Sequence, residues 1–239
     1  MRTLVVIPTY NEIDNVRPMA FDVLQQHVDI DVLFVDDNSP DGTPEAVRQL
    51  AADESRVHAL IRPSRLGLGS AYLAGFDFAL ERDYEAVVTM DADFSHAPRY
   101  IPALLDQLRD RDIVVGSRYV RGGGVKNWGL VRRWFSRAAN LYTRLLLWIP
   151  TRDCTAGFRA YRSEALRRLP LDGVLSSGYA ALEELMYLAH KVGFKVDEVP
   201  IIFEGRRAGE SKISHREIFH GLCHVPLLRV RSLFGIGSL

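Results

Sequence analysis

The sequence predicts an α/β fold, built on a mostly parallel sheet with helices on both of its faces. Two observations support this prediction. Short apolar segments rich in β-branched residues alternate with amphipathic helical segments through residues 1–117, an order typical of parallel sheets covered by helices. Acidic and turn-forming residues directly follow several of the apolar segments, at the edge where such sheets bind ligands.

Five strands and four helices are expected in this first half. Apolar runs bounded by turn signals predict the strands, at residues 3–8, 32–35, 57–61, 86–90 and 113–116. Apolar residues at helical spacing, such as Val16, Ala20 and Val23, predict the helices, at residues 16–27, 43–50, 68–80 and 98–108. Pro44 and Pro98 stand near the start of two of these helices, where proline is favoured.

The second half is less regular and is expected to be mainly helical. The expected elements are a loop at 122–124, a long helix at 130–149, a shorter helix near Glu164, a helix at 178–192 and a strand around 196–203. Pro150 stops the long helix because proline cannot continue it. Residues 214–239 are expected to start as a helix that Pro226 interrupts.

Composition excludes several classes of protein. The 239 residues are 47% hydrophobic and 25% charged, which fits one large globular domain or a domain with an appended arm. Thirty basic residues balance thirty acidic ones, which argues against a nucleic-acid partner that binds through a broad positive field. Cys154 and Cys223 lie far apart without metal-ligand spacing, so we expect a reducing, intracellular setting.

No targeting or membrane-spanning segment is expected. The run Leu4 to Ile7 is too short for a signal peptide. No stretch reaches the ~18 uninterrupted apolar residues that a spanning helix requires. Any contact with a membrane is therefore expected at its surface.

Two acidic clusters follow predicted strands. Asp91-Ala92-Asp93 comes after residues 86–90, and Asp36-Asp37 comes after residues 32–35. Both strands would end at the same edge of a wound sheet, so the four carboxylates should lie near one another. Mg²⁺ and Mn²⁺ accept such oxygens, with water and substrate phosphates filling the other positions. The alternative is that these residues only shape turns, and we expect this role for Asp36.

Three further segments are candidates for a nucleotide site. Tyr10 and Glu12 follow the first strand, where a ring can stack on a base and a carboxylate can accept hydrogen bonds from it. Arg206 and Lys212 lie in a glycine-containing loop after a strand, and Arg118 follows residues 113–116. Such cations can hold phosphates, although a solvated charged turn is an alternative. For the glycines of residues 67–69 we favour loop geometry over anion binding.

The long helix at 130–149 is amphipathic. One face carries Arg133, Arg137, Asn140 and Arg144, and the opposite face carries aromatic and aliphatic residues. Such a helix can lie at an anionic bilayer surface. Amphipathic helices of ordinary globular proteins instead pack their apolar face on the core. Both interpretations remain open at this point.

The motifs together resemble one family. They are residues 8–12 (PTYNE), 35–43 (VDDNSPDGT), 67–72 (GLGSAY), 90–96 (MDADFSH), 116–119 (GSRY), 153–159 (DCTAGFR) and 209–212 (GESK). This ordered set is similar to that of the dolichol-phosphate and polyprenol-phosphate mannosyltransferases, inverting glycosyltransferases of family 2. The resemblance implies a GT-A fold, a mostly parallel Rossmann-like sheet with a C-terminal helical region on the acceptor side. It also implies transfer of mannose from GDP-mannose to a polyprenyl phosphate.

The resemblance implies roles for individual residues. The guanosine part of the donor would be held by Pro8, Tyr10, Glu12, Val35 and Asp37. The diphosphate would be bound through Mg²⁺ or Mn²⁺ by Asp91, Ala92 and Asp93, with the two aspartates as the metal ligands. Phosphates would be bound by Arg118, Arg206 and Lys212, and Arg132 would join Arg118 at the acceptor phosphate. The groups acting directly in catalysis would be Asp91, Asp93, Arg118 and Lys212. Asp153 and Arg159 also match family positions, with a structural role equally open.

We therefore expect a catalytic domain at 1–213 and an amphipathic extension at 214–239. The domain comprises a nucleotide-binding half at 1–117 and an acceptor and phosphate-clamp half at 118–213. The resemblance implies a peripheral protein on the cytoplasmic face of a membrane and leaves open a membrane-anchoring subunit. Leu182 stands where the family often has Gln, and Ser95 where some relatives have Gln. Three alternatives remain: a transferase that moves glucose or another sugar from a UDP-sugar to a polyprenyl phosphate, a non-catalytic subunit that binds sugar nucleotides, and a soluble transferase that acts on glycans.

Overall fold

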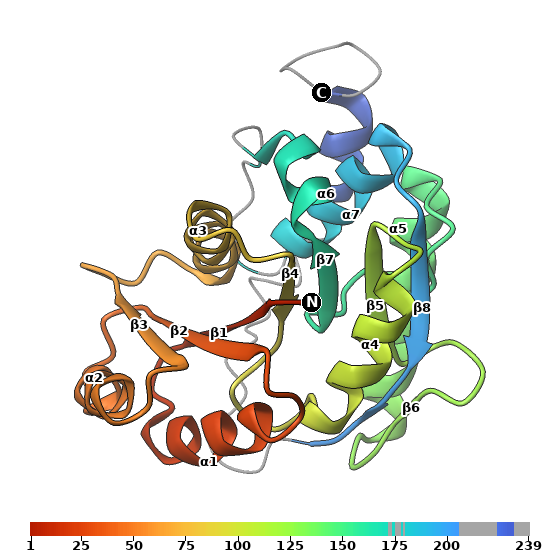
Figure 1. Cartoon of the computed structure of the whole chain (residues 1–239). Helices are drawn as coiled ribbons and strands as arrows, with labels where there is room; N and C mark the ends of the chain where they lie inside the picture. The colour runs from red at the N-terminus through yellow and green to blue at the C-terminus, as the bar shows by residue number, and fades with distance from the viewer. Residues whose placement is uncertain (172–173, 175–177, 179, 206–223, 232–239) are drawn as a thin grey trace.

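A seven-stranded sheet forms the centre of the protein. The computed structural model describes residues 1–171, 174, 178, 180–205 and 224–231. The strand order is β3-β2-β1-β4-β7-β5-β8 (Figure 1), and all neighbours run parallel except β7, which is antiparallel to β4 and β5. The strands are β1 (Thr3–Thr9), β2 (Ile30–Asp36), β3 (Val57–Ile61), β4 (Ala86–Thr89), β5 (Ile113–Ser117), β7 (Arg159–Arg162) and β8 (Val196–Pro200). The predicted mostly parallel α/β fold is thus confirmed.

Helices cover both faces of the sheet. They are α1 (Ile13–Leu24), α2 (Thr43–Asp53), α3 (Leu68–Glu81), the 3₁₀ turn η1 (Pro98–Tyr100), α4 (Ile101–Leu108), α5 (Leu130–Leu147), α6 (Ser163–Arg168) and α7 (Ala180–Val192). Val5 and Ile7 of β1 pack in one core cluster with α1, α2 and α4. Leu4 and Val6 pack in the other with α3, α6 and α7. The division follows from the alternation of side chains along a strand.

The single strand predicted around 196–203 is replaced in the structure by two strands that belong to different sheets. The chain leaves β8 after Pro200, and β9 (Ile202–Phe203) pairs with β6 (Gly124–Val125) in a separate two-stranded sheet. The break sends the chain from the edge of the main sheet toward the loop that follows β5. The expectation of one continuous strand was therefore wrong.

Several predicted helix boundaries also differ: α1 spans Ile13–Leu24 rather than 16–27, and α2 ends at Asp53 rather than at 50. α5 ends at Leu147 rather than at 149, because Trp148 has a left-handed backbone conformation with φ of 58° that cannot continue the helix. Residues 224–231 are helical and include Pro226, and the rest of the predicted extension, 214–223 and 232–239, lies outside the described residues. Val225 and Leu228 of this stretch are buried in a third core cluster with Leu147, and this packing supports the helix. Among the described residues, no helix has the length and apolar character needed to span a membrane.

Candidate active site

The carboxyl ends of three neighbouring parallel strands meet at one edge of the sheet. β2, β1 and β4 are adjacent, so Asp37, Tyr10 and Asp91 follow strands that end side by side. Pro8 and Val35 are paired across β1 and β2 just before this edge. Ala92, between the two aspartates that follow β4, is 3% exposed. The two acidic clusters thus share the predicted edge.

Asp36 stabilises the turn that follows β2. Its carboxylate accepts hydrogen bonds from the hydroxyls of Thr9 at 2.8 Å and Ser39 at 2.7 Å, and from the backbone N–H of Ser39 at 2.9 Å. The side chain is fully buried. These bonds give Asp36 the structural role expected from the sequence.

Asp37 is held by an arginine that the sequence analysis missed. Arg62, which follows β3, donates Nε to Asp37 Oδ1 at 2.6 Å, and its Nη2 bonds to the same oxygen. The Gly67 N–H donates to Asp37 Oδ2 at 2.8 Å. Gly67 has φ of +93°, a conformation that side chains rarely adopt. The Gly67 N–H therefore organises the loop, which agrees with the loop-geometry interpretation.

Tyr10 and Glu12 lie beside this arrangement. The guanidinium carbon of Arg65 is 4.2 Å from the centre of the Tyr10 ring. Glu12 is mostly buried, and its Oε2 accepts a hydrogen bond from Asn15 at 2.7 Å. Arg65, which no sequence motif singled out, thus adds a planar cation to an aromatic ring at the candidate nucleoside end of the site.

Asp91 and Asp93 differ in their surroundings. The Asp91 side chain is 27% exposed, and its Oδ2 lies 3.6 Å from His96 Nδ1, which also accepts a hydrogen bond from the Asp91 N–H. Asp93 is 3% exposed, and its Oδ1 accepts the Ser95 N–H at 3.0 Å. His96 belongs to the motif at 90–96, but the sequence suggested no role for it. In the structure, its contacts with Asp91 help to position that carboxylate.

The carboxylates of Asp91 and Asp93 fit a divalent cation whose other ligands would come from the substrate. Within the described ranges, no group of three or more His, Cys, Asp or Glu side chains is arranged to hold a metal. Two carboxylates that share one loop are the usual protein contribution to a Mg²⁺ site, with phosphates and water completing it. The donor set thus suits Mg²⁺ or Mn²⁺ together with a diphosphate, and not a closed structural site.

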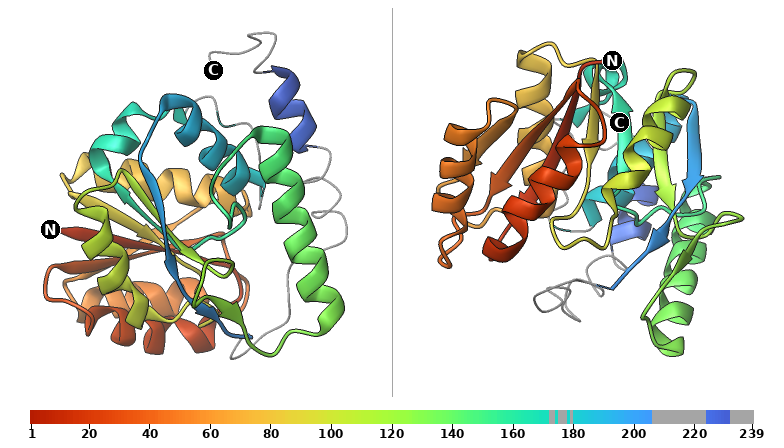
Figure 2. Two further views of the ribbon diagram at one scale, coloured as in Figure 1. Left: turned by 90° about the vertical axis from the view of Figure 1, so that its right-hand side faces the viewer. Right: turned by 60° about the horizontal axis from the view of Figure 1, so that its bottom comes forward.

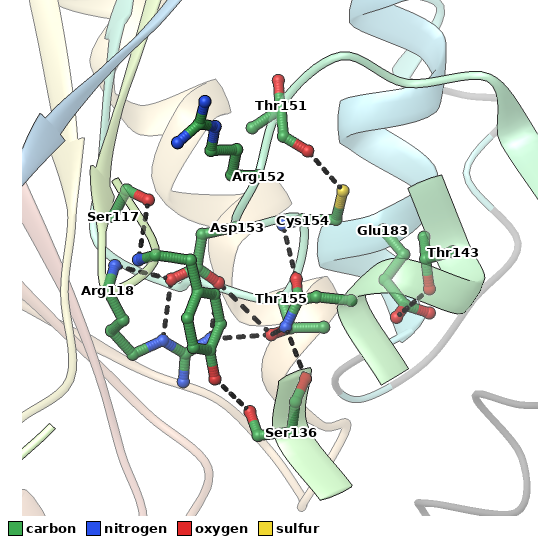
Figure 3. Close-up of polar contacts among 12 residues, drawn as sticks. Ser117, Arg118, Ser136, Thr143, Thr151, Arg152, Asp153, Cys154, Thr155 and Glu183 are labelled. Carbon is green, nitrogen blue, oxygen red and sulfur yellow. Dashed lines mark hydrogen bonds and ion pairs between the residues drawn. The ribbon is translucent and has the colours of Figure 1, made fainter. Parts of the chain in front are cut away.

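Arg118 is fixed by a buried ion pair (Figure 3). Its Nε and Nη2 donate to the two oxygens of Asp153 at 2.7 and 2.6 Å, and Nη2 also donates to Thr155 Oγ1 at 2.7 Å. Burial alone would lower the pKa of Arg118, but the charge and hydrogen bonds of Asp153 outweigh it and raise this pKa, with a smaller contribution from Asp91. Arg118 stays charged, and Asp153 is the residue that orients it.

The antiparallel strand β7 explains how Asp153 reaches the site. Because β7 runs against β4 and β5, its amino end lies where their carboxyl ends lie. The loop before it therefore enters this edge of the sheet. A Cβ on Gly157 in this loop would lie 3.5 Å from Asp91 Oδ1. The motif at 153–159 is visible in the sequence, but the short strand that places it was not predicted.

An aromatic cluster joins Arg118 to Arg132. The guanidinium carbons of Arg118 and Arg132 lie 5.8 and 4.2 Å from the centre of the Trp128 ring, and the Phe203 ring is 5.5 Å from Arg118. The structure thus brings together the two arginines that the sequence analysis assigned to the acceptor phosphate. Arg206 and Lys212 lie outside the described residues.

Buried polar groups lie behind the ion pair. Arg159 is fully buried and donates to the backbone carbonyls of Leu182 at 2.8 Å and Cys154 at 2.7 Å, which gives it a structural role. Burial raises the pKa of the Cys154 thiol to about 12, so this cysteine is no nucleophile. Burial also raises the pKa of Glu183 to about 7, although a hydrogen bond from Thr143 opposes the shift.

Glu183 should make stability fall as pH rises. Its folded-state pKa of about 7 exceeds the ordinary glutamate pKa of 4.5, so the folded state binds the proton more tightly. The stabilisation from protonated Glu183 is present below the unfolded pKa and is lost as pH rises through about 7, by at most about 3 kcal/mol. We expect Glu183→Gln to remove this loss in urea unfolding between about pH 5 and about pH 8. Glu164→Gln, at an exposed position, is the control, and an equal pH dependence in all three proteins would contradict the assignment.

Comparison with known proteins gives the family. Residues 4–169 match the Glycosyl transferase family 2 model. The chain is 46% identical over 215 residues to an undecaprenyl-phosphate mannosyltransferase of Micrococcus luteus, covering 90% of this chain and 88% of the relative. It is 48% identical over 232 residues to a polyprenol monophosphomannose synthase of Mycolicibacterium smegmatis, covering 96% and 88%.

The fold is also that of solved structures. Glucosyl-3-phosphoglycerate synthase from Mycobacterium tuberculosis, in complex with Mn²⁺, UDP and glucosyl-3-phosphoglycerate, superposes with a TM-score of 0.67 at 19% identity, covering 98% of this chain and 80% of that one. A complex of the same enzyme with Mg²⁺ and UDP gives a TM-score of 0.66 at 19% identity, covering 98% and 79%. The chain therefore belongs to glycosyl transferase family 2, within the polyprenol-phosphate mannosyltransferase group that its motifs resemble.

Proposed function

We propose that the protein is an inverting glycosyltransferase that moves mannose from GDP-mannose to a polyprenyl (dolichyl-type) monophosphate, giving polyprenyl β-mannosyl phosphate. The observation that carries the proposal is that the loop before β7 reaches both groups: its Asp153 pairs with Arg118, and a Cβ on its Gly157 would lie 3.5 Å from Asp91 Oδ1. The two carboxylates that we assign to the metal and a fixed cation thus lie at one edge of the sheet. The names of the two bacterial relatives support the sugar and the lipid class.

The residues divide into a donor end and an acceptor end. We assign the guanosine part to Pro8, Tyr10, Glu12, Val35 and Asp37, and the diphosphate to the segment 91–93. Mg²⁺ or Mn²⁺ bound by Asp91 and Asp93 would supply Lewis-acid stabilisation of the negative charge that grows on the leaving diphosphate. We assign Arg206 and Lys212 to the donor phosphates from their motif alone.

The acceptor needs binding and orientation more than deprotonation. A phosphate monoester already carries about −1.5 to −2 charge near neutral pH, so a strong general base is unnecessary. Arg118, held at its Nε and Nη2 by Asp153, and Arg132, on the same Trp128 ring, would bind and orient this phosphate. One in-line attack on the anomeric carbon would invert its configuration. We place the reaction at the cytoplasmic face of a membrane, with the protein bound peripherally, directly or through an anchoring subunit.

A donor screen tests this assignment. Purified protein is incubated with a short, water-soluble polyprenyl phosphate, Mn²⁺ or Mg²⁺, and either GDP-mannose or UDP-glucose. We expect transfer from GDP-mannose, because the nucleoside end carries a carboxylate, Glu12, that can accept hydrogen bonds from an amino-bearing base. Mass spectrometry of the lipid product is the measurement. Transfer from UDP-glucose alone would overturn the choice of donor, and nucleotide binding without any transfer would favour a non-catalytic subunit.

A further inference from the structure

The apolar face of α5 points to solvent. Its large apolar side chains are mostly exposed, namely Leu130 (73%), Val131 (84%), Trp134 (73%), Phe135 (48%), Leu141 (52%) and Leu145 (66%), with Trp148 (79%) just past its end. At 3.6 residues per turn, Leu130, Trp134, Leu141 and Leu145 fall within about 60° of one another. They form one continuous stripe, which we call the α5 apolar face. α5 runs along the outside of the molecule (Figure 2).

The side of α5 that packs on the protein includes buried polar residues. Asn140 and Thr143 are 2% and 1% exposed. Asn140 accepts the Cys154 N–H at 2.8 Å and donates to Thr155 Oγ1 at 3.1 Å, and Thr143 donates to Glu183. A surface helix of a globular protein normally has the reverse orientation. The core-packing interpretation holds for one side of the helix, where Tyr142 and Leu146 pack against a core cluster that contains Leu147 and Ile149. It does not hold for the α5 apolar face, and an exposed patch of this kind marks an interaction surface.

The charges of α5 select the class of partner. The helix contains four arginines, Arg132, Arg133, Arg137 and Arg144, and no acidic residue. Arg133, Arg137 and Arg144 border the apolar face on one side, within about 60° of Leu130, whereas Arg132 lies nearly opposite the centre of this face, by the same helical geometry. A second copy of this face would bring like charges together, whereas anionic lipid headgroups would neutralise them. Tryptophans near both ends suit the boundary between headgroups and acyl chains.

We propose that the α5 apolar face docks on the surface of an anionic lipid bilayer, with the helix lying in the plane of the headgroups. This inference rests on the proposed function, since a lipid acceptor gives the enzyme its reason to reach a bilayer. The helix is tied to the acceptor end of the site, because Asn140 bonds to Thr155 and Thr155 accepts from Arg118. Docking along α5 thus fixes how far Arg118 and Arg132 lie from the plane of the lipid phosphates.

The helical stretch 224–231 adjoins the end of this face. Val225 and Leu228 pack in the same core cluster as Leu147 and Ile149. The guanidinium carbon of Arg229 lies 5.5 Å from the centre of the Trp148 ring. Leu227 and Val230 of this stretch are 52% and 46% exposed. The stretch therefore supports the end of α5 and adds apolar and cationic groups beside it.

Vesicle flotation tests the docking surface. The probes are vesicles of phosphatidylcholine alone and of phosphatidylcholine mixed with phosphatidylglycerol. We expect the wild type to float with the mixed vesicles, and Trp134→Gln combined with Leu145→Gln to weaken this binding at least about tenfold. Phe21→Gln combined with Val28→Gln is the matched control, because these side chains are 63% and 78% exposed outside α5. Arg137→Gln should reduce binding to mixed vesicles only, and high salt should reduce it likewise.

Activity separates this inference from the proposed function. The Trp134/Leu145 variant should transfer mannose to a short, water-soluble acceptor at the wild-type rate and to a long polyprenyl phosphate in vesicles more slowly. Equal flotation of this variant and the wild type, or no flotation of the wild type, would overturn the inference. A wild-type dimer that the variant converts to a monomer in light scattering would overturn it in favour of self-association. Flotation that depends on α5 without transfer to any acceptor would sustain the docking surface and refute the proposed function.

Discussion

Replacing Asp93 by Ala should lower kcat/KM for mannosyl transfer at least about a thousandfold, on the order of 4 kcal/mol of transition-state stabilisation. Asp93 is 3% exposed and lies in the loop that follows β4, at the edge of the sheet assigned to the diphosphate. Its loss removes one of the two carboxylates that fit the divalent cation. Transfer assays with saturating Mn²⁺ are the measurement, and Asp93→Asn should be similarly impaired because an amide binds such a cation more weakly.

The fold should survive these substitutions. Asp93 accepts the Ser95 N–H, and Asn offers an oxygen that can do the same, so Asp93→Asn should retain a cooperative thermal transition near that of the wild type. Asp106→Asn is a matched control on the exposed side of α4, where the side chain is 73% exposed. Wild-type turnover in Asp93→Ala, or undiminished wild-type activity in excess EDTA, would refute the role of the 91–93 segment.

Replacing Asp153 by Ala should destabilise the protein by about 3–5 kcal/mol, because it leaves Arg118 charged and unpaired in a buried position. Asp153 is fully buried, and the Arg118 side chain is 8% exposed. The free energy of unfolding from urea titration is the measurement. Activity should fall as well, since Asp153 fixes the Arg118 guanidinium through two hydrogen bonds.

Removing both charges distinguishes the contribution of the Arg118–Asp153 ion pair to stability from the contribution of side-chain packing. Asp153→Leu combined with Arg118→Met should recover part of the lost stability, because hydrophobic residues can replace a buried ion pair at little cost. It should remain inactive, since no cation is left at that position. Glu45→Ala is the control for an exposed ion pair and should cost less than about 1 kcal/mol. If Asp153→Ala cost no more than Glu45→Ala, the ion pair would not be the organising contact described above.

The local parts of this site could be predicted from the sequence. Apolar runs and helical spacing predicted five parallel strands of the main sheet, and the turn residues after them marked the edge where ligands bind. Asp36 was expected to stabilise its turn, and three hydrogen bonds show that it does. These features depend on residues close together in the chain, so a short stretch of sequence carries them.

The partners from distant segments were missed. Arg62 pairs with Asp37 across 25 residues, and Arg118 with Asp153 across 35. Strand β7 is only four residues long, contains two arginines and has β4 and β5 on its two sides. No local pattern identifies such a strand, because its stability comes from neighbours that the fold supplies.

The sequence by itself determined the alternation of strands and helices, the positions of the carboxylates and the two-sided character of α5. Only the tertiary structure decided which side of α5 faces the protein. An amphipathic pattern shows that the two faces of a helix differ. Which face packs on the protein depends on the groups that each face can contact in the folded structure. Here Asn140 and Thr143 meet buried hydrogen-bonding partners, because satisfying polar groups in the interior fixes the helix as firmly as apolar packing does.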